Sequence, residues 1–486
     1  MGNDTADRTP EHVDVLIIGA GLSGIGAACQ LTRRHPGKSV AVLEARGASG
    51  GTWDLFRYPG IRSDSDMFTF SYPWRPWPSD TALADGPMIL DYMRTVAREY
   101  DVERLIRYHH RVTAASWDSD TARWTVTVDR DGETITMTTG FLWSCAGYYD
   151  YERPYFPEFP GAERFQGQLI HPQLWPEDLE YAGKRVVVIG SGATAVTLVP
   201  AMAKDAAHVT MLQRSPTYIL PLPGRDPLAR LLRRLPAKQR FSVVRWKNVL
   251  TQLGTFTLAR RRPGLARRLI RATNVKALPE GYPVDVHFRP RYNPWEQRLC
   301  VVPDGDLFKA IRNGSADIVT DTIETFTESG IRLTSGRELE ADIVIAATGL
   351  NVLLFGGLKF EVDGRPVELA RTMAYKALML SGVPNFAYTV GYTNASWTLK
   401  ADLVVDYVCR LLDHMDRHGL RQVVPERDPS VGEMPFIDFN AGYVLRALDR
   451  VPKQGDRAPW LLKQNYLSDL RTIRRDPIDD GVLTFA

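Results

Sequence analysis

The sequence predicts an α/β fold with two Rossmann-like dinucleotide-binding domains, the second inserted into the first. Three observations lead to this prediction. A strand-forming run followed by G-x-G-x-x-G stands near the N-terminus, a second strand–glycine–helix unit begins at Arg185, and two later buried runs end in small residues plus glycine. A chain of 486 residues is also too long for one ordinary hydrophobic core.

The first unit begins with the β-branched run at residues 13–18. Gly19, Gly21 and Gly24 follow in G-x-G-x-x-G spacing and open a helical pattern. The first glycine allows a tight turn, the second lets backbone approach a pyrophosphate, and the third lets the helix pack on the strand. The next strand ends at Glu44, whose carboxylate can accept hydrogen bonds from a ribose diol. This order of features predicts a site for a dinucleotide with an unmodified adenosine ribose, such as FAD.

The second unit reads R-V-V-V-I-G-S-G-A-T-A, and Gly190, Gly192 and Thr194 are its predicted cofactor contacts. Its second strand ends in Gln213 and Arg214, with no acid at the position equivalent to the glutamate of the first unit. A guanidinium in place of a carboxylate favours a 2′-phosphate, so this unit is predicted to bind NADPH. The alternative for Arg214 is an ordinary surface arginine.

Two strand ends indicate where the chain passes between the units. F-L-W-S-C-A-G ends the first unit at Gly147, and A-D-I-V-I-A-A-T-G ends a later strand at Gly349. Backbone at such ends can approach a cofactor closely. The predicted division, in chain order, is a discontinuous FAD-binding domain at 1–150 and 340–486, a linker at 151–176, and an NADPH-binding domain at 177–339.

Composition limits the other classes of function. The four cysteines lie far apart, which predicts neither a zinc site nor a disulfide framework and argues against a flavin–dithiol reductase. No metal is expected. The polar N-terminal stretch has no apolar signal core, and no run reaches the roughly 18 apolar residues that span a bilayer. A cytoplasmic protein is therefore expected.

One segment is strongly basic. Residues 225–276 carry fifteen Lys or Arg and one acid, Asp226, within a chain of net charge +3, which leaves 45 basic and 56 acidic residues elsewhere. Leucines and arginines recur there at helical spacing. One interpretation is a helical insertion that packs its Leu/Val face on the NADPH-binding domain; the other is an interfacial helix pair that contacts anionic lipid. Nucleic-acid binding is not expected, because no recognition motif accompanies the charge.

The predicted linker carries a pattern that resembles the fingerprint of type I Baeyer–Villiger monooxygenases, which are class B flavin monooxygenases. The pattern is F-x-G-x-x-x-H-x-x-x-W-P. A second family motif, G-x-W-x-x-x-x-Y-P-G-x-x-x-D, ends at Asp64, and runs such as T-N-A-S-W-T-L-K are similar to the ethionamide-monooxygenase subgroup. The residues that carry the two motifs are Phe165, Gly167, His171, Trp175 and Pro176, and Gly51, Trp53, Tyr58, Pro59, Gly60 and Asp64.

The resemblance implies an FAD-dependent monooxygenase that uses NADPH and O₂ to insert oxygen beside a ketone carbonyl, giving esters or lactones, often with sulfoxidation. The alternatives are a flavin monooxygenase acting mainly on sulfur or nitrogen, as in sulfides and thioamides, and a flavoprotein sensor that does not oxygenate. Discrimination between them requires product analysis.

The resemblance also assigns roles to residues. Arg298 matches the active-site arginine of the family, and Asp64 would orient it; an ordinary phosphate-binding or surface arginine and a helix N-cap are the respective alternatives. Gly51 and Trp53 are predicted FAD contacts. Gln297 occupies a position where many members have a lysine for the 2′-phosphate, which leaves more of that discrimination to Arg214.

Other residues receive structural or substrate-binding roles. His171 is expected to fix the linker and respond to nucleotide binding, not to transfer a proton, and Trp175 is expected to be a packed anchor. Asn351, Asn394 and Trp397 are predicted to help line a pocket for an apolar or long-chain substrate.

Overall fold

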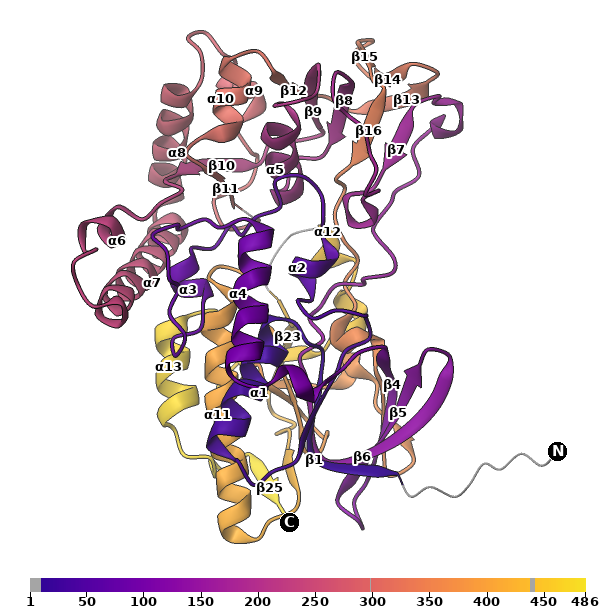
Figure 1. Ribbon diagram of the computed structural model, residues 1–486, viewed down its shortest axis with the longest axis vertical. Coiled ribbons are helices and arrows are strands. Elements are labelled where there is room, and N and C mark those ends of the chain that lie inside the picture. Colours follow the sequence, from indigo (N-terminus) through magenta and orange to yellow (C-terminus); the bar gives the residue numbers. More distant parts are fainter. Residues whose placement is uncertain (1–9, 298, 438–441) are drawn as a thin grey trace, which may run out of the picture.

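The computed structural model describes residues 10–297, 299–437 and 442–486. Two sheets organise them, one in the lower and one in the upper part of the molecule as drawn in Figure 1. The fold is mixed α/β with two Rossmann-like units, as predicted.

The lower sheet has nine strands and carries the first glycine loop. Their order is β18-β17-β4-β5-β6-β1-β2-β3, and β21 also pairs with β6. β1 pairs in parallel with β2 and β6, and its last four residues are buried, as expected for an interior parallel strand. The strands are β1 (Glu11–Ile18), β2 (Val40–Leu43), β3 (Ile106–Arg107), β4 (His110–Asp118), β5 (Arg123–Arg130), β6 (Glu133–Ser144), β17 (Lys359–Val362), β18 (Arg365–Pro366) and β21 (Phe386–Tyr388).

The upper sheet has five parallel strands in the order β12-β9-β8-β16-β7 and carries the second glycine loop. A small antiparallel sheet of β13 (Ile323–Thr327), β14 (Gly330–Leu333) and β15 (Glu338–Glu340) precedes β16 in the chain. The strands of the upper sheet are β7 (Gln168–Ile170), β8 (Arg185–Ile189), β9 (His208–Gln213), β12 (Ala316–Thr320) and β16 (Ile343–Ala346).

Helices cover both units. In the lower unit α1 packs on α11, the longest helix there, and in the upper unit α5 packs on α10. The helices outside the basic segment are α1 (Leu22–Arg34), α2 (Thr52–Leu55), α3 (Met67–Phe70), α4 (Gly86–Glu99), α5 (Ala193–Met202), α9 (Val284–His287), α10 (Asp306–Arg312), α11 (Trp397–His418), α12 (Gly442–Leu445) and α13 (Tyr466–Arg475).

The linker and its return path are more regular than their sequence indicates. Gln168–Ile170 forms β7, the edge strand of the upper sheet, and pairs in parallel with β16. β16 also pairs with β8, so the chain leaves the upper sheet after Ala346 instead of at the predicted boundary of 340. A three-residue strand has too little periodicity to be recognised from sequence, and partner pairing decides its structure.

The basic segment forms α6 (Pro227–Leu231), α7 (Ala237–Arg261) and α8 (Pro263–Ala277), which lie along the left edge of Figure 1. One of the two interpretations of this insertion is that it packs on the NADPH-binding, upper unit. α8 does contact β10 (Tyr218–Leu222) there, but α7 packs on α3 of the lower unit. The insertion therefore bridges the units. Within the described ranges, no helix is long and apolar enough to cross a membrane.

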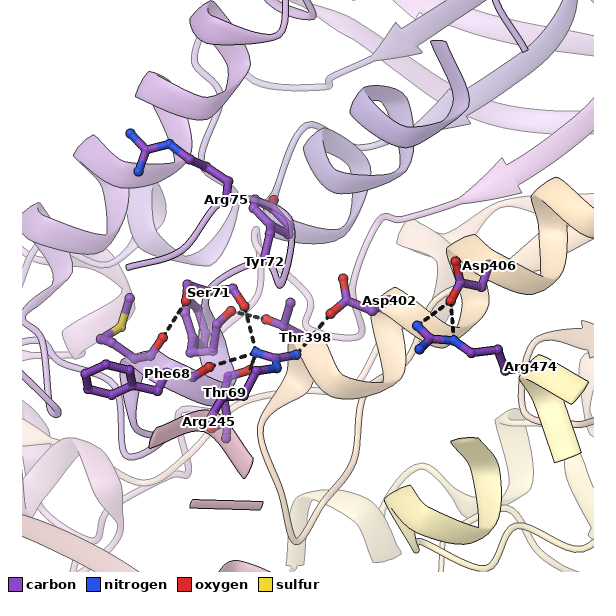
Figure 2. Close-up of polar contacts among 12 residues, drawn as sticks. Phe68, Thr69, Ser71, Tyr72, Arg75, Arg245, Thr398, Asp402, Asp406 and Arg474 are labelled. Carbon is purple, nitrogen blue, oxygen red and sulfur yellow. Dashed lines mark hydrogen bonds and ion pairs between the residues drawn. The ribbon is translucent and has the colours of Figure 1, made fainter. Parts of the chain in front are cut away.

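A buried arginine fixes α7 on the lower unit. The guanidinium of Arg245 lies between α3 and α11 and forms an ion pair with Asp402 at 3.2 Å (Figure 2). It also donates to three carbonyl oxygens at the end of α3, at 2.8, 3.2 and 3.0 Å, those of Phe68, Thr69 and Ser71. Its donors are thus shared between backbone and carboxylate, which satisfies a charge that would otherwise be costly to bury.

Candidate active site

The first glycine loop is shaped by close backbone approaches. A Cβ atom on Gly19 would lie 2.8 Å from the carbonyl oxygen of Cys145, and one on Gly24 would lie 1.8 Å from that of Gly19. A Cβ on Gly51 would lie 3.0 Å from the Cα of Gly21. The structure thus brings four of the predicted glycines together at the start of α1, and a larger residue at Gly19 or Gly24 would collide with backbone. The free N–H groups of a helix start favour an anionic ligand.

Glu44 lies beside this loop at the end of β2 and is buried. Its two carboxylate oxygens accept hydrogen bonds from the backbone N–H groups of Ala20, at 2.8 Å, and Arg46, at 2.9 Å. Burial raises the pKa of Glu44, and these two hydrogen bonds oppose the rise. A carboxylate has about four acceptor positions, so each oxygen can also accept from a ribose hydroxyl.

The start of α11 faces the same loop. The indole Nε1 of Trp397 donates to Ser23 Oγ at 2.8 Å, which connects α11 to α1. The hydroxyl of Ser396, just before α11, is buried and has no hydrogen-bond partner among the described residues. An unsatisfied buried hydroxyl, a glycine cradle and a buried carboxylate fit FAD. Trp53, another predicted contact, lies on α2 with its ring edge-on to Phe70 at 5.7 Å.

The second glycine loop repeats the arrangement of the first. A Cβ on Gly190 would lie 2.4 Å from the carbonyl oxygen of Ala347, after β16, as Gly19 lies against the residue after β6. Gly192 precedes α5, and a Cβ there would meet nothing within 4 Å, so the start of α5 is open. Arg214 follows β9 at the same sheet edge and is exposed. These residues fit an NADPH pyrophosphate and 2′-phosphate.

Tyr58, Pro59 and Gly60 join the two units. Burial raises the pKa of the Tyr58 hydroxyl, and its hydrogen bond to Thr194 of α5 opposes the rise. Gly60 has φ +76°, and a Cβ there would lie 2.6 Å from the Cβ of Ala201 and 3.0 Å from the carbonyl oxygen of Thr197. The glycine therefore lets this loop of the lower unit pack directly on α5. Thr194, predicted as a cofactor contact, lies at this junction.

Asp64 is half-buried in the segment that follows. The helix N-cap considered as its alternative role belongs to Asp66, whose side chain accepts from Thr69 N at 3.0 Å. Arg298, the predicted partner of Asp64, lies outside the described residues. Gln297 immediately precedes it and is half-buried, and Cys300 is fully buried in β11 (Leu299–Pro303).

The fingerprint stretch holds the upper unit to the linker. A Cβ on Gly167 would lie 2.4 Å from the carbonyl oxygen of Asp342 and 2.5 Å from the ring of Phe165, so only glycine fits. The Phe165 ring packs edge-on against Phe326 at 5.8 Å. Trp175 is half-buried against the core of the upper unit, as expected of an anchor, and Pro176 follows it.

His171 connects the outgoing and returning segments of the chain. Its Nδ1 accepts from Gln173 N at 3.1 Å, so Nε2 carries the hydrogen and donates to the carbonyl oxygen of Gly349 at 3.2 Å. Burial lowers the pKa of His171, which favours the neutral ring. Both ring nitrogens bond to backbone. This arrangement supports a structural role.

A cavity lies beside Trp397 and has an empty volume of about 1430 Å³, open solvent at its mouth included. Trp397 lines it and stacks on Tyr148 with ring centroids 5.3 Å apart. The other two predicted pocket residues are not among those that line this cavity. Asn394 Nδ2 donates to the carbonyl oxygen of the lining residue Gln464 at 2.9 Å, whereas Asn351 Nδ2 donates to Arg153 O at 3.0 Å, away from the lining. Most of the remaining wall is apolar, for example Leu354, Phe436, Val444, Leu448, Val451 and Leu462.

One wall of this cavity carries charge that the sequence reasoning missed. Lys400 Nζ lies 2.8 Å from Asp469 Oδ2, which also accepts from the Tyr392 hydroxyl at 2.8 Å. All three residues line the cavity. Burial lowers the pKa of Lys400, and Asp469 opposes this. The available signal was a lysine inside the apolar pattern that begins α11.

Comparison with known proteins adds family evidence. Residues 62–228 match a model described as flavin-binding monooxygenase-like, and residues 17–79 match an NAD(P)-binding Rossmann-like domain. The FAD-containing monooxygenase EthA of Mycobacterium tuberculosis is 57% identical over 479 residues, 98% of each chain.

Two solved structures share the fold. A steroid monooxygenase bound to NADP matches with a TM-score of 0.72 and 24% identity, over 86% of this chain and 88% of that one. A cyclohexanone-bound cyclohexanone monooxygenase matches with a TM-score of 0.71 and 21% identity, over 87% and 90%.

Proposed function

Because the chain belongs to the FAD-containing monooxygenases, we propose that it inserts one oxygen atom of O₂ beside the carbonyl of an apolar ketone. The enzyme uses NADPH and FAD. The products would be an ester or lactone, NADP⁺ and water. Bound FAD, once reduced by NADPH, supplies the activation of O₂; the protein supplies binding, orientation and electrostatics.

The fingerprint stretch carries this proposal. Gly167 and His171 hold this stretch in place. Gly167 packs against the carbonyl oxygen of Asp342, where a larger residue would collide, and His171 hydrogen-bonds to Gly349. In the related heteroatom oxygenases, by resemblance, the tryptophan position usually holds another aromatic residue and the proline is missing. The names of the two solved structures with this fold, both ketone- or steroid-oxygenating, lend further support.

The cavity beside Trp397 is the proposed substrate site. Its apolar wall suits the hydrocarbon part of a ketone, because apolar burial stabilises binding by about 25 cal/mol per Å². The Lys400–Asp469 pair would face a polar substituent at the opposite wall. A sulfide of the same shape would fit equally well, so sulfoxidation is the second candidate activity.

Arg298 is proposed to stabilise the negative charge that develops during oxygen insertion, with Asp64 orienting it. A guanidinium stays protonated and presents its donors in one plane. Removing one preorganised donor of this kind typically raises a barrier by about 3–4 kcal/mol.

Product analysis tests the function. Holoenzyme is supplied with NADPH, ¹⁸O₂ and a panel of ketones and matched sulfides, and products are identified by mass. We expect esters carrying one ¹⁸O.

The variant Arg298→Ala should retain FAD and lose ester formation by roughly 100- to 1,000-fold. The matched control is Arg291→Ala, at an exposed arginine seven positions earlier in the chain. Labelled sulfoxide without any ester would establish the sulfur alternative, and NADPH oxidation without labelled product would establish the sensor alternative.

A further inference from the structure

The inner side of α7 combines apolar residues that pack in the core, Phe241, Val244 and Val249, with buried polar residues, whereas further apolar side chains point outward. Besides Arg245, its inner face presents Asn248 and Gln252, whose amides donate to the two carboxylate oxygens of Asp66 at 2.7 and 2.8 Å. These residues are spaced three and four apart, so they share one face. The inner face is thus fixed by core packing and by polar contacts to α3 and α11, as Figure 2 shows for Arg245.

The outer face of α7 is apolar and exposed. Val243, Trp246 and Leu250 follow at helical spacing on the side opposite the inner face and are 47%, 45% and 56% exposed. Leu231 on α6 is 76% exposed. Leu235, in the turn between α6 and α7, and Leu265 and Leu269, on α8, are exposed as well. The helices α6, α7 and α8 together form what we term the outer surface.

The charge of the outer surface has one sign. Asp226, the single acid of the segment, is buried, caps α6 and pairs with Lys247 at 2.5 Å. Exposed arginines occur along all three helices and the turns between them, and in the described part of the chain they form no ion pair within 4 Å; they are Arg230, Arg233, Arg234, Arg260, Arg261, Arg262, Arg267 and Arg268. Apolar side chains together with unpaired cations complement an anionic lipid surface.

We propose that the outer surface docks the protein on an anionic lipid membrane. The apolar stripe enters the interfacial layer and the arginines bind lipid phosphates. A symmetric pair of this chain would bring the same cationic surfaces together, which is repulsive. An anionic membrane instead offers phosphates to these exposed arginines.

Docking would also place the substrate cavity near lipid. Trp246 contacts Tyr466 at the start of α13, with ring centroids 6.4 Å apart, and the next residues of α13, Ser468, Asp469 and Thr472, line the cavity. Figure 1 shows α13 beside the lower end of α7. An apolar substrate dissolved in the membrane could therefore reach the cavity past α13; this step rests on the proposed function.

Vesicle binding tests the proposal. Holoenzyme is sedimented with large vesicles of phosphatidylcholine alone, or of equimolar phosphatidylcholine and phosphatidylglycerol, at low and high salt. We expect binding to the anionic vesicles that weakens with salt. Arg233→Gln/Arg234→Gln should weaken it by roughly thirtyfold, and Val243→Ser/Trp246→Ser/Leu250→Ser should abolish it. Met88→Ser, an exposed apolar position on α4, is the matched control and should bind like wild type.

Other outcomes would overturn the proposal. These are absence of binding at low salt, equal binding to neutral vesicles, and binding that survives both sets of substitutions. A wild-type dimer that the triple serine variant converts to monomer, without vesicle binding, would assign the surface to a second copy. Activity on a water-dispersed ketone separates the proposal of membrane docking from the proposal of ketone oxygenation. If neither wild type nor any variant oxygenates the ketone, the proposed function is rejected, and the result of vesicle binding still stands.

Discussion

Arg214 and Gln213 are neighbours with opposite orientations. The Gln213 side chain is buried and donates to His287 O and Thr320 Oγ1, both at 2.8 Å. Arg214 points to solvent and, among described residues, has no hydrogen-bond or ion-pair partner. Ser191 of the glycine loop donates to Ser215 O at 3.2 Å, which keeps the loop beside this arginine. Its guanidinium is thus free for a phosphate.

The exposed position of Arg214 yields a kinetic prediction. Arg214→Ala should raise KM for NADPH by roughly ten- to a hundredfold, the effect of losing a charge-assisted hydrogen bond, with little change in KM for NADH. Steady-state kinetics with both cofactors measures this. Arg332→Ala, at an exposed arginine of β14, is the control. Equal rises for NADPH and NADH would remove the 2′-phosphate assignment.

Among single residues, the sequence predicts those whose role depends on the backbone geometry of their own segment. The glycines of both loops were found because turn geometry and close approach require them. The distinction between Asp64 and Asp66 as N-cap could not be made, because both stand before the same short helix. Lys400 and Asp469 are 69 positions apart, and no local sequence pattern predicts that two such distant residues form a pair.

Helices and strands likewise divide into those that their own sequence predicts and those that depend on a distant partner. Long, patterned elements such as β1 and α1 follow from their own sequence. β7 forms because β16 offers an edge to pair with. The orientation of α7 depends on α3, whose last carbonyl oxygens accept hydrogen bonds from Arg245. Because α7 has apolar residues on both faces, its sequence does not indicate which face packs against the rest of the protein.

The contact between α7 and α11 predicts a pH dependence of stability. Burial raises the pKa of Asp402 to about 7, against the opposing charge of Arg245, while Asp406 of α11 and Arg474 of α13 are the other charges nearby. The ordinary aspartate pKa is about 3.9, so between about pH 4 and 7 the folded protein binds one proton more than the unfolded chain. This contribution to the unfolding free energy is fully present below about pH 4 and is lost as pH rises through 7.

Chemical denaturation at pH 5 and pH 8 checks this prediction. From pH 5 to pH 8, wild type should lose more unfolding free energy than Asp402→Asn, whose side chain does not titrate. Asp416→Asn removes an exposed carboxylate of the same helix that pairs with a lysine, Lys38, and not with a histidine, so it should keep the wild-type profile. Identical profiles for wild type and Asp402→Asn would show that Asp402 does not take up the proton.

For the whole molecule, the two passages of the chain between the units form one paired connector. Asp150 N donates to Asn351 O at 2.9 Å, Leu353 N donates to Tyr148 O at 3.0 Å, and His171 bonds to Gly349 beside them. Further contacts at the Gly60 loop and between Arg62 and Asp306, at 2.6 Å, fix the units elsewhere. Any change in the relative position of the units must therefore bend this connector.

His171 allows that coupling to be measured. His171→Ala removes the hydrogen bond to Gly349, worth about 1 kcal/mol, so the fraction of units in the productive arrangement should fall by up to roughly fivefold. The expected result is NADPH oxidation that yields more hydrogen peroxide and less oxygenated product, at unchanged FAD content, because His171 contacts the connector and not the first glycine loop. His171→Gln retains an N–H donor and should recover most of the coupling. A proton-transfer role predicts instead that both variants lose turnover equally while the ratio of peroxide to product stays constant.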